Sequence, residues 1–91
     1  MSRERHNVHF TGKVQGVGFR YTTRNLAAGR AVTGYVHNLS DGRVQLVAEG
    51  EANELRSFVQ AIADHFGDYI HEKLVDVTPA NDEFDDFQIR F

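Results

Sequence analysis

The sequence contains no cysteine. The chain can therefore form neither disulfides nor thiolate metal sites, and it has no thiolate nucleophile for covalent catalysis. A lack of cysteine fits a protein of a reducing compartment, and we expect a cytoplasmic location.

Long apolar runs and an excess of positive charge are missing too. No run approaches the ~18 residues needed to span a bilayer, and the polar residues 1–6 do not have the pattern of a signal peptide. The formal net charge is -3 and the pI about 5.9, so no overall basic field attracts nucleic acid or an anionic membrane. We therefore expect neither as a partner, and an anion site would have to be local.

The length of 91 residues allows one small domain with one hydrophobic core. The chain shows no internal repeat, linker or low-complexity tract. We expect a short polar N-terminal extension over residues 1–6 and a single domain over residues 7–91. We also expect the protein to be a monomer.

Hydrophobic periodicity places the secondary structure. Alternating apolar residues predict strands, whereas apolar residues three and four apart predict helices. Ser40-Asp41-Gly42 is typical of a turn and predicts a hairpin, Gly50 is expected to break the strand before it, and Asn81-Asp82-Glu83 is expected to be a polar turn. The predicted elements are a strand at 7–13, a helix at 21–28, strands at 32–38 and 43–49, a helix at 52–67, and strands at 74–78 and 87–91.

This order of elements predicts the fold class. Helices between strands around a central hairpin favour a split βαβ arrangement. We predict an α+β protein with a ferredoxin-like two-layer sandwich, βαββαβ with a short extra C-terminal strand. The sheet is expected to be antiparallel, with its first and third strands central and two helices on one face.

The stretch from Gly12 to Arg20 combines several features that favour an oxyanion. Gly16 and Gly18 let the backbone curl with positive φ. Successive backbone N–H groups in such a curl form an anion nest, and a helix start beyond it adds further free donors. Arg20 places a planar guanidinium at the rim. All three features suit a phosphate group.

Taken alone, this stretch leaves two interpretations open. It is not a Walker loop, since Lys13 precedes the glycines, and it lacks the third glycine of a dinucleotide-binding motif. A tight strand-to-helix turn with an incidental arginine explains an isolated Gly-x-Gly equally well. Asn38, before the predicted turn, could likewise bond its own backbone rather than a ligand.

Two motifs resemble signatures of the acylphosphatase family. The first is Gly12-x-Val14-Gln15-Gly16-Val17-Gly18-Phe19-Arg20, and the second is Gly34-Tyr35-Val36-His37-Asn38-Leu39-Ser40-Asp41-Gly42. They occur in the family's order and separation, and the resemblance covers nearly the whole chain. It implies a ferredoxin-like fold and a hydrolase that cleaves an acyl phosphate, a small molecule, to carboxylate and inorganic phosphate.

The resemblance also implies roles for individual residues. Arg20 and Asn38 would be catalytic, with Arg20 holding the phosphate and Asn38 orienting the attacking water. No cofactor and no metal would be required. The phosphate-binding loop would consist of Gln15, Gly16, Val17, Gly18, Phe19 and Arg20.

One departure from the family pattern and two competing functions remain. His37 replaces the usual basic residue before the asparagine, and we expect a modest change in substrate affinity rather than lost chemistry. A non-catalytic ferredoxin-like module could bind an anionic metabolite or a phosphorylated partner through the same loop. An RNA-binding sheet is disfavoured, because the strand at 43–49 carries no aromatic residue.

Overall fold

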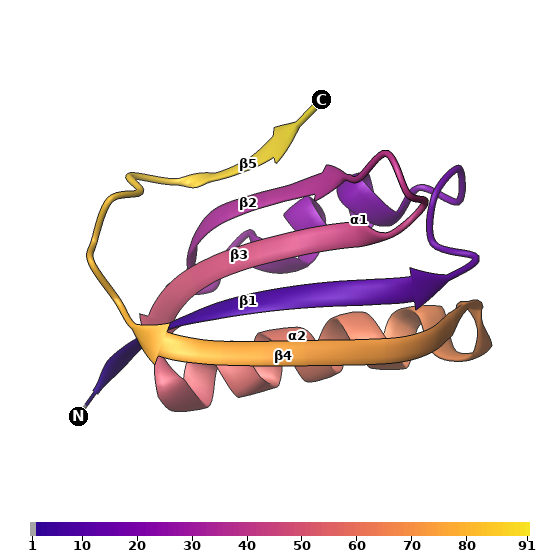
Figure 1. Ribbon diagram of the computed structural model, residues 1–91. Helices are drawn as coiled ribbons and strands as arrows, with labels where there is room; N and C mark the ends of the chain where they lie inside the picture. Colours follow the sequence, from indigo (N-terminus) through magenta and orange to yellow (C-terminus); the bar gives the residue numbers. More distant parts are fainter. Residues whose placement is uncertain (1) are drawn as a thin grey trace.

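The computed structural model describes residues 2–91 as a five-stranded sheet with two helices on one face (Figure 1). The strand order β4-β1-β3-β2-β5 confirms the predicted ferredoxin-like sandwich, in which the first and third strands are central. The elements are β1 (Arg3–Gly12), α1 (Phe19–Ala27), β2 (Thr33–Asn38), β3 (Val44–Glu51), α2 (Ala52–Phe66), the 3₁₀ turn η1 (Gly67–Tyr69), β4 (Ile70–Pro79) and β5 (Phe87–Arg90).

The sheet is mixed, whereas the sequence predicted an antiparallel sheet. β1 pairs antiparallel with β3 and β4, and β3 pairs antiparallel with β2. β5, however, runs parallel to β2. β4 ends beside the start of β1, at the same end of the sheet where β2 starts. The connection to β5 crosses the sheet at this end, so β5 has to run in the direction of β2 (Figure 1).

The hydrophobic core lies between the sheet and the helices. Alternate residues of a strand share one face, and Val8 and Phe10 of β1 are fully buried on the helix-covered face. The apolar stripe predicted for α2 is buried against them and consists of Leu55, Phe58, Val59, Ile62 and Phe66. Burial of this stripe explains why α2 forms over nearly the predicted range, with Gly67 ending it at a positive φ.

Two strands begin earlier than predicted. β1 starts at Arg3, so residues 3–6 of the expected polar extension pair with β3, and residues 4–6 pair with β4 as well. β4 starts at Ile70 rather than at residue 74. β4 is an edge strand, and its residues 71–79 are all exposed. Because neither segment has to bury a regular set of apolar side chains, periodicity gave no signal for these ends.

Gly50 does not break β3, contrary to the prediction. The strand continues to Glu51, and Gly50 pairs with Glu4 of β1. A Cβ at position 50 would lie 2.8 Å from the Ala31 carbonyl oxygen. Glycine therefore serves here for the close approach of another backbone segment, a common role of glycine inside a strand.

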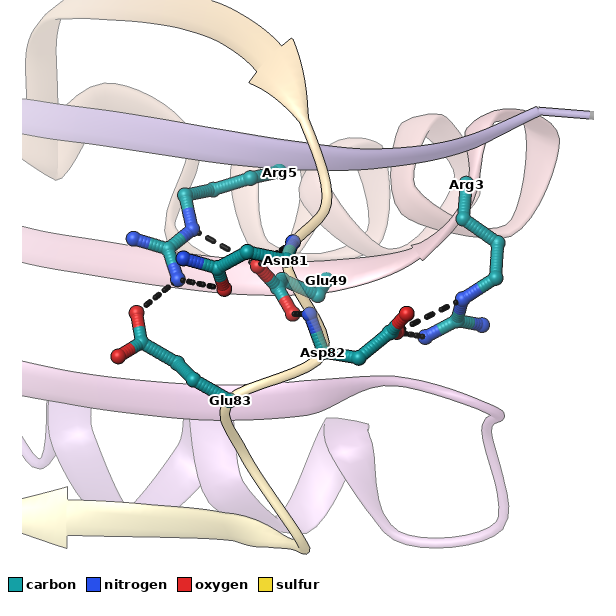
Figure 2. Close-up of polar contacts among 6 residues, drawn as sticks. All are labelled: Arg3, Arg5, Glu49, Asn81, Asp82 and Glu83. Atoms are coloured by element: carbon teal, nitrogen blue, oxygen red, sulfur yellow. Dashed lines mark hydrogen bonds and ion pairs between the residues drawn. The ribbon is translucent and has the colours of Figure 1, made fainter.

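Residues 80–86, here called the strap, cross the face of the sheet that the helices leave open. Their polar groups surround Glu49 of β3, whose side chain is 0% exposed (Figure 2). Its carboxylate accepts hydrogen bonds from Arg5 Nε at 2.8 Å, from Asn81 N at 3.1 Å and from Asp82 N at 3.0 Å. The segment predicted as a polar turn thus fastens the strap to the sheet.

Two arginines of β1 extend this contact. Arg3 donates two hydrogen bonds to Asp82 Oδ1, at 2.8 and 3.0 Å, and Arg5 contacts both Asn81 Oδ1 and Glu83. The hydrogen bond from Arg5 lowers the pKa of the Glu83 carboxyl below its usual value. The strap ends beside β2, where Gly34 N donates a hydrogen bond to Asp86 O at 2.9 Å. β5 begins at the next residue, Phe87.

Candidate active site

The predicted site residues gather at one end of the sheet. β1 and β2 both run antiparallel to β3, so their C-terminal ends lie at the same end. The loop after β1 leads into α1 (Figure 1), and Asn38 is the last residue of β2. The topology therefore brings Arg20 and Asn38 together, although 17 residues of chain, 21–37, separate them.

The glycines of the loop adopt the predicted conformation. Gly16 and Gly18 each have a φ of 77°, a value that side-chain-bearing residues rarely adopt. Gly18 is the N-cap of α1, and Thr22 N donates to Gly18 O at 3.0 Å. α1 thus begins at Phe19, two residues before the predicted start, which places Arg20 inside the first turn.

The start of α1 offers unused hydrogen-bond donors. The first N–H groups of a helix have no acceptor within the helix, and no side chain caps this end of α1 in residues 2–91. The first turn contains no acidic residue that would compete for an anion. These N–H groups and the helix dipole favour a negatively charged group at this position.

Buried side chains hold the loop at both ends. Val14 is fully buried, and the Phe19 ring stacks on Phe66 with a centroid distance of 4.2 Å. Lys13 N donates to Tyr69 O at 2.8 Å, which ties the loop to η1. The loop backbone is therefore fixed by the core before any ligand arrives, as electrostatic preorganisation requires.

A cavity of about 210 Å³ lies in front of the loop, lined by Val14, Gly16, Gly18, Phe19, Arg20, Tyr21 and Asn38. Four of the predicted phosphate-loop residues, Gly16, Gly18, Phe19 and Arg20, line it. Gln15 and Val17 do not line it. Tyr21 was not among the predicted site residues, because ordinary packing was the preferred interpretation of an aromatic residue at this position, over an apolar wall near the substrate.

Gln15 and Val17 have other contacts. Val17 is partly buried against the core. The side-chain amide of Gln15 donates to Leu39 O at 2.8 Å and to Arg43 O at 3.0 Å. Gln15 thereby connects the glycine loop to the hairpin that carries Asn38.

The Asn38 side chain does not make the turn contact that was its alternative interpretation. Asn38 Oδ1 is buried and has no hydrogen-bond partner among residues 2–91. In the turn itself, Asp41 Oδ1 accepts from Arg43 N at 3.0 Å, and this bond lowers the Asp41 pKa. A buried acceptor without a partner is costly, which makes Asn38 Oδ1 a candidate to bind a ligand or a water.

The guanidinium of Arg20 leans toward the end of β5. Arg20 Nη1 donates to Arg90 O at 3.4 Å, and Arg20 Cζ lies 4.7 Å from the centroid of the Phe91 ring. Arg90 and Phe91 lie 70 and 71 positions from Arg20 in the chain, so the loop motif did not predict these contacts.

Two further findings concern metal binding and membrane insertion. Within residues 2–91 there is no group of three or more His, Cys, Asp or Glu residues placed to hold a metal ion. None of the helices described here is long and apolar enough to cross a membrane.

Comparisons with known proteins give a consistent result. The acylphosphatase family model matches residues 6–89. An acylphosphatase from Salinibacter ruber is 41% identical over 92 residues, which is 98% of this chain and 95% of the relative. The solved structure of an acylphosphatase from Bacillus subtilis is 34% identical, with a TM-score of 0.88 over 97% of this chain and 99% of that one. An acylphosphatase structure from Coxiella burnetii is 31% identical, with a TM-score of 0.85 over 98% and 94% of the two chains.

Proposed function

This chain belongs to the acylphosphatase family, and from that premise we propose that it hydrolyses the carboxyl–phosphate bond of acyl phosphates, with Arg20 and Asn38 as its catalytic residues. The observation that carries this proposal is the buried Oδ1 of Asn38, which has no hydrogen-bond partner in the described part of the chain and belongs to the cavity that the glycine loop and Arg20 also line. A water held by this oxygen would share the cavity with a bound phosphate.

The phosphate group of the substrate would occupy the loop. Backbone N–H groups of the glycine loop and of the first turn of α1 would donate to its oxygens, and the Arg20 guanidinium would neutralise its charge. Phosphoryl transfer depends mostly on positioning and on stabilising charge at the equatorial oxygens. A fixed set of N–H donors and one guanidinium supplies both.

Asn38 would position the nucleophile. Its Oδ1 can accept a hydrogen bond from water, and its Nδ2 can donate to a phosphate oxygen. The water oxygen attacks phosphorus, and the bond from phosphorus to the acyl oxygen breaks. The carboxylate leaves with the electron pair of that bond, and the proton of the water passes to the phosphate. A carboxylate is a weak base, so its departure needs no general acid, and the proposed mechanism uses no metal and no covalent intermediate.

The test is phosphate release from acetyl phosphate and benzoyl phosphate, measured with a chelator present. We expect turnover by the wild type. Asn38→Ala should lower kcat by about 10²-fold or more, while inorganic phosphate should still bind as a competitive inhibitor. Arg20→Ala should lower kcat/KM by about 10³-fold and abolish phosphate inhibition.

Two exposed residues provide matched controls. Asn25→Ala on α1 and Arg56→Ala on α2 remove the same side-chain types outside the cavity, and both variants should retain wild-type kinetics. If the wild type binds phosphate without hydrolysing either substrate, the proposal fails and the chain is a non-catalytic module for an anionic metabolite or a phosphorylated partner. The cytoplasmic location, the monomeric state and the absence of nucleic-acid and membrane partners stay predictions.

A further inference from the structure

A second hollow, of about 390 Å³, borders the cavity of the candidate active site. Its walls are Tyr21 and Arg24 from α1, and Phe87, Gln88, Ile89 and Phe91 from β5 and the residue after it. Tyr21 lines both hollows. Phe91 of the second hollow contacts Arg20 of the first, with 4.7 Å between Arg20 Cζ and the ring centroid. The two hollows are therefore neighbours across Tyr21 and Arg20.

Four of the six residues that line the second hollow have aromatic or aliphatic side chains. Phe87 and Ile89 are partly buried against the core, whereas the two residues nearest the active-site cavity are open to solvent. Tyr21 is 50% exposed and Phe91 is 86% exposed. Exposed aromatic side chains that gather beside a polar site are typical of surfaces that bind apolar groups. The six lining residues include no acidic side chain, and Arg24 adds a positive charge, with its Cζ 5.4 Å from the Tyr21 ring centroid. A negatively charged substrate would meet no repulsion from these walls.

We propose that this hollow receives the acyl group of the substrate and favours aromatic or other extended apolar acyl groups over small ones. This inference rests on the proposed function, because it needs the phosphate of the substrate to lie in the neighbouring cavity. The acyl carbonyl is bonded through a single oxygen to phosphorus, so the rest of the acyl group begins within a few bonds of the loop. A benzoyl ring can reach the Tyr21 wall from there, whereas the methyl group of an acetyl can cover little of it.

Tyr21→Ala tests this assignment through a ratio of rates. The measured quantity is kcat/KM for benzoyl phosphate divided by kcat/KM for acetyl phosphate. Removal of a large apolar contact at a pocket wall changes such discrimination by about tenfold, so the ratio should fall by about that factor. The inhibition constant of inorganic phosphate should stay at its wild-type value, because alanine keeps the backbone N–H of residue 21. Tyr21→Phe keeps the ring and should retain the wild-type ratio.

Leu74→Ala is the matched control. Leu74 is 51% exposed on β4, the strand at the opposite edge of the sheet from β5, so this variant should leave both rates unchanged. Equal losses for the two substrates in Tyr21→Ala, or an unchanged ratio, would overturn the assignment while leaving the proposed function intact. If the wild type hydrolyses neither substrate, both proposals fall together.

Discussion

The strap and the glycine loop use the same chemistry at opposite ends of the sheet. Around the strap, two backbone N–H groups and the Arg5 guanidinium surround the carboxylate of Glu49 (Figure 2). Around the loop, the N–H groups of a helix start and the Arg20 guanidinium surround a cavity. Both arrangements suit an oxyanion with charge-assisted hydrogen bonds.

The difference between the two regions is the origin of the oxyanion. The chain itself supplies a carboxylate to the strap, and its burial joins β1, β3 and the strap into one unit. At the loop, Arg20 Nη1 donates to Arg90 O. No side chain of residues 2–91 caps the N–H groups at the start of α1, so a ligand would provide the oxygens for them. The comparison teaches that the same kind of hydrogen-bond donors can contribute to stability or to function. They stabilise the fold where a carboxylate of the protein accepts their hydrogen bonds, and they can bind a ligand where no such acceptor is present.

Replacing Glu49 should have the largest effect on stability. Glu49→Gln removes the buried charge and leaves Arg5 and two backbone N–H groups with a poorer acceptor. We expect a loss of roughly 3 kcal/mol in the free energy of unfolding, measured by urea denaturation, with kcat/KM changed less than about twofold at temperatures where the variant is folded. The control is Glu72→Gln on the exposed edge strand β4. A loss below about 0.5 kcal/mol, the range of ordinary surface substitutions, would mean that the carboxylate does not fasten the strap.

A comparison of Gly16→Ala with Gly29→Ala should separate the effect of backbone strain on stability from the effect of the loop conformation on phosphate binding. The two glycines have φ values of 77° and 81°, and a Cβ at either would meet no atom of the described chain within 4 Å. Each variant should therefore lose roughly 1 kcal/mol of stability from the positive φ alone. Gly16 lines the cavity, whereas Gly29 follows the far end of α1.

Only Gly16→Ala should also raise the inhibition constant of phosphate, by about tenfold, since small misplacements of positioning groups are costly. Denaturation and inhibition measured on both variants give the comparison. If phosphate binding weakens equally in both, general destabilisation rather than the loop conformation controls the site.

The smallest predicted effect on stability is that of the Glu83 carboxylate, and it should depend on pH. Arg5 lowers the pKa of Glu83 in the folded state, so the folded protein favours the ionised carboxylate. This contribution to stability is present above the unfolded-state pKa, about 4.3 for glutamate, and is lost as the pH falls through the lower folded-state value. Glu83→Gln should be slightly less stable than the wild type at pH 7, and the difference in melting temperature should vanish in acid. A difference that persists below both pKa values would exclude this ion pair as its cause.

The region that the sequence predicted best is the one built from neighbouring residues. The glycine loop, α1 and the β2–β3 hairpin follow from local signals such as Gly16, Gly18 and the turn at residues 40–42, and the family resemblance adds Asn38 to the same site. The strap was predicted only as a polar turn, because Glu49 and Asn81 are 32 residues apart and Arg5 and Glu83 are 78 apart. Such pairs depend on strand register, which periodicity alone does not determine.

Gln15 has a further consequence for the rate of the proposed reaction. Its side chain joins the loop that would hold phosphorus to the hairpin that would hold the water. The phosphorus atom and the water oxygen would thus be held by two segments that are fixed relative to each other. The entropic cost of aligning the two atoms would then be incurred during folding rather than in each turnover. In kinetic language, the hairpin presents the water at a high effective molarity, which for well-oriented groups reaches about 10⁵ M or more.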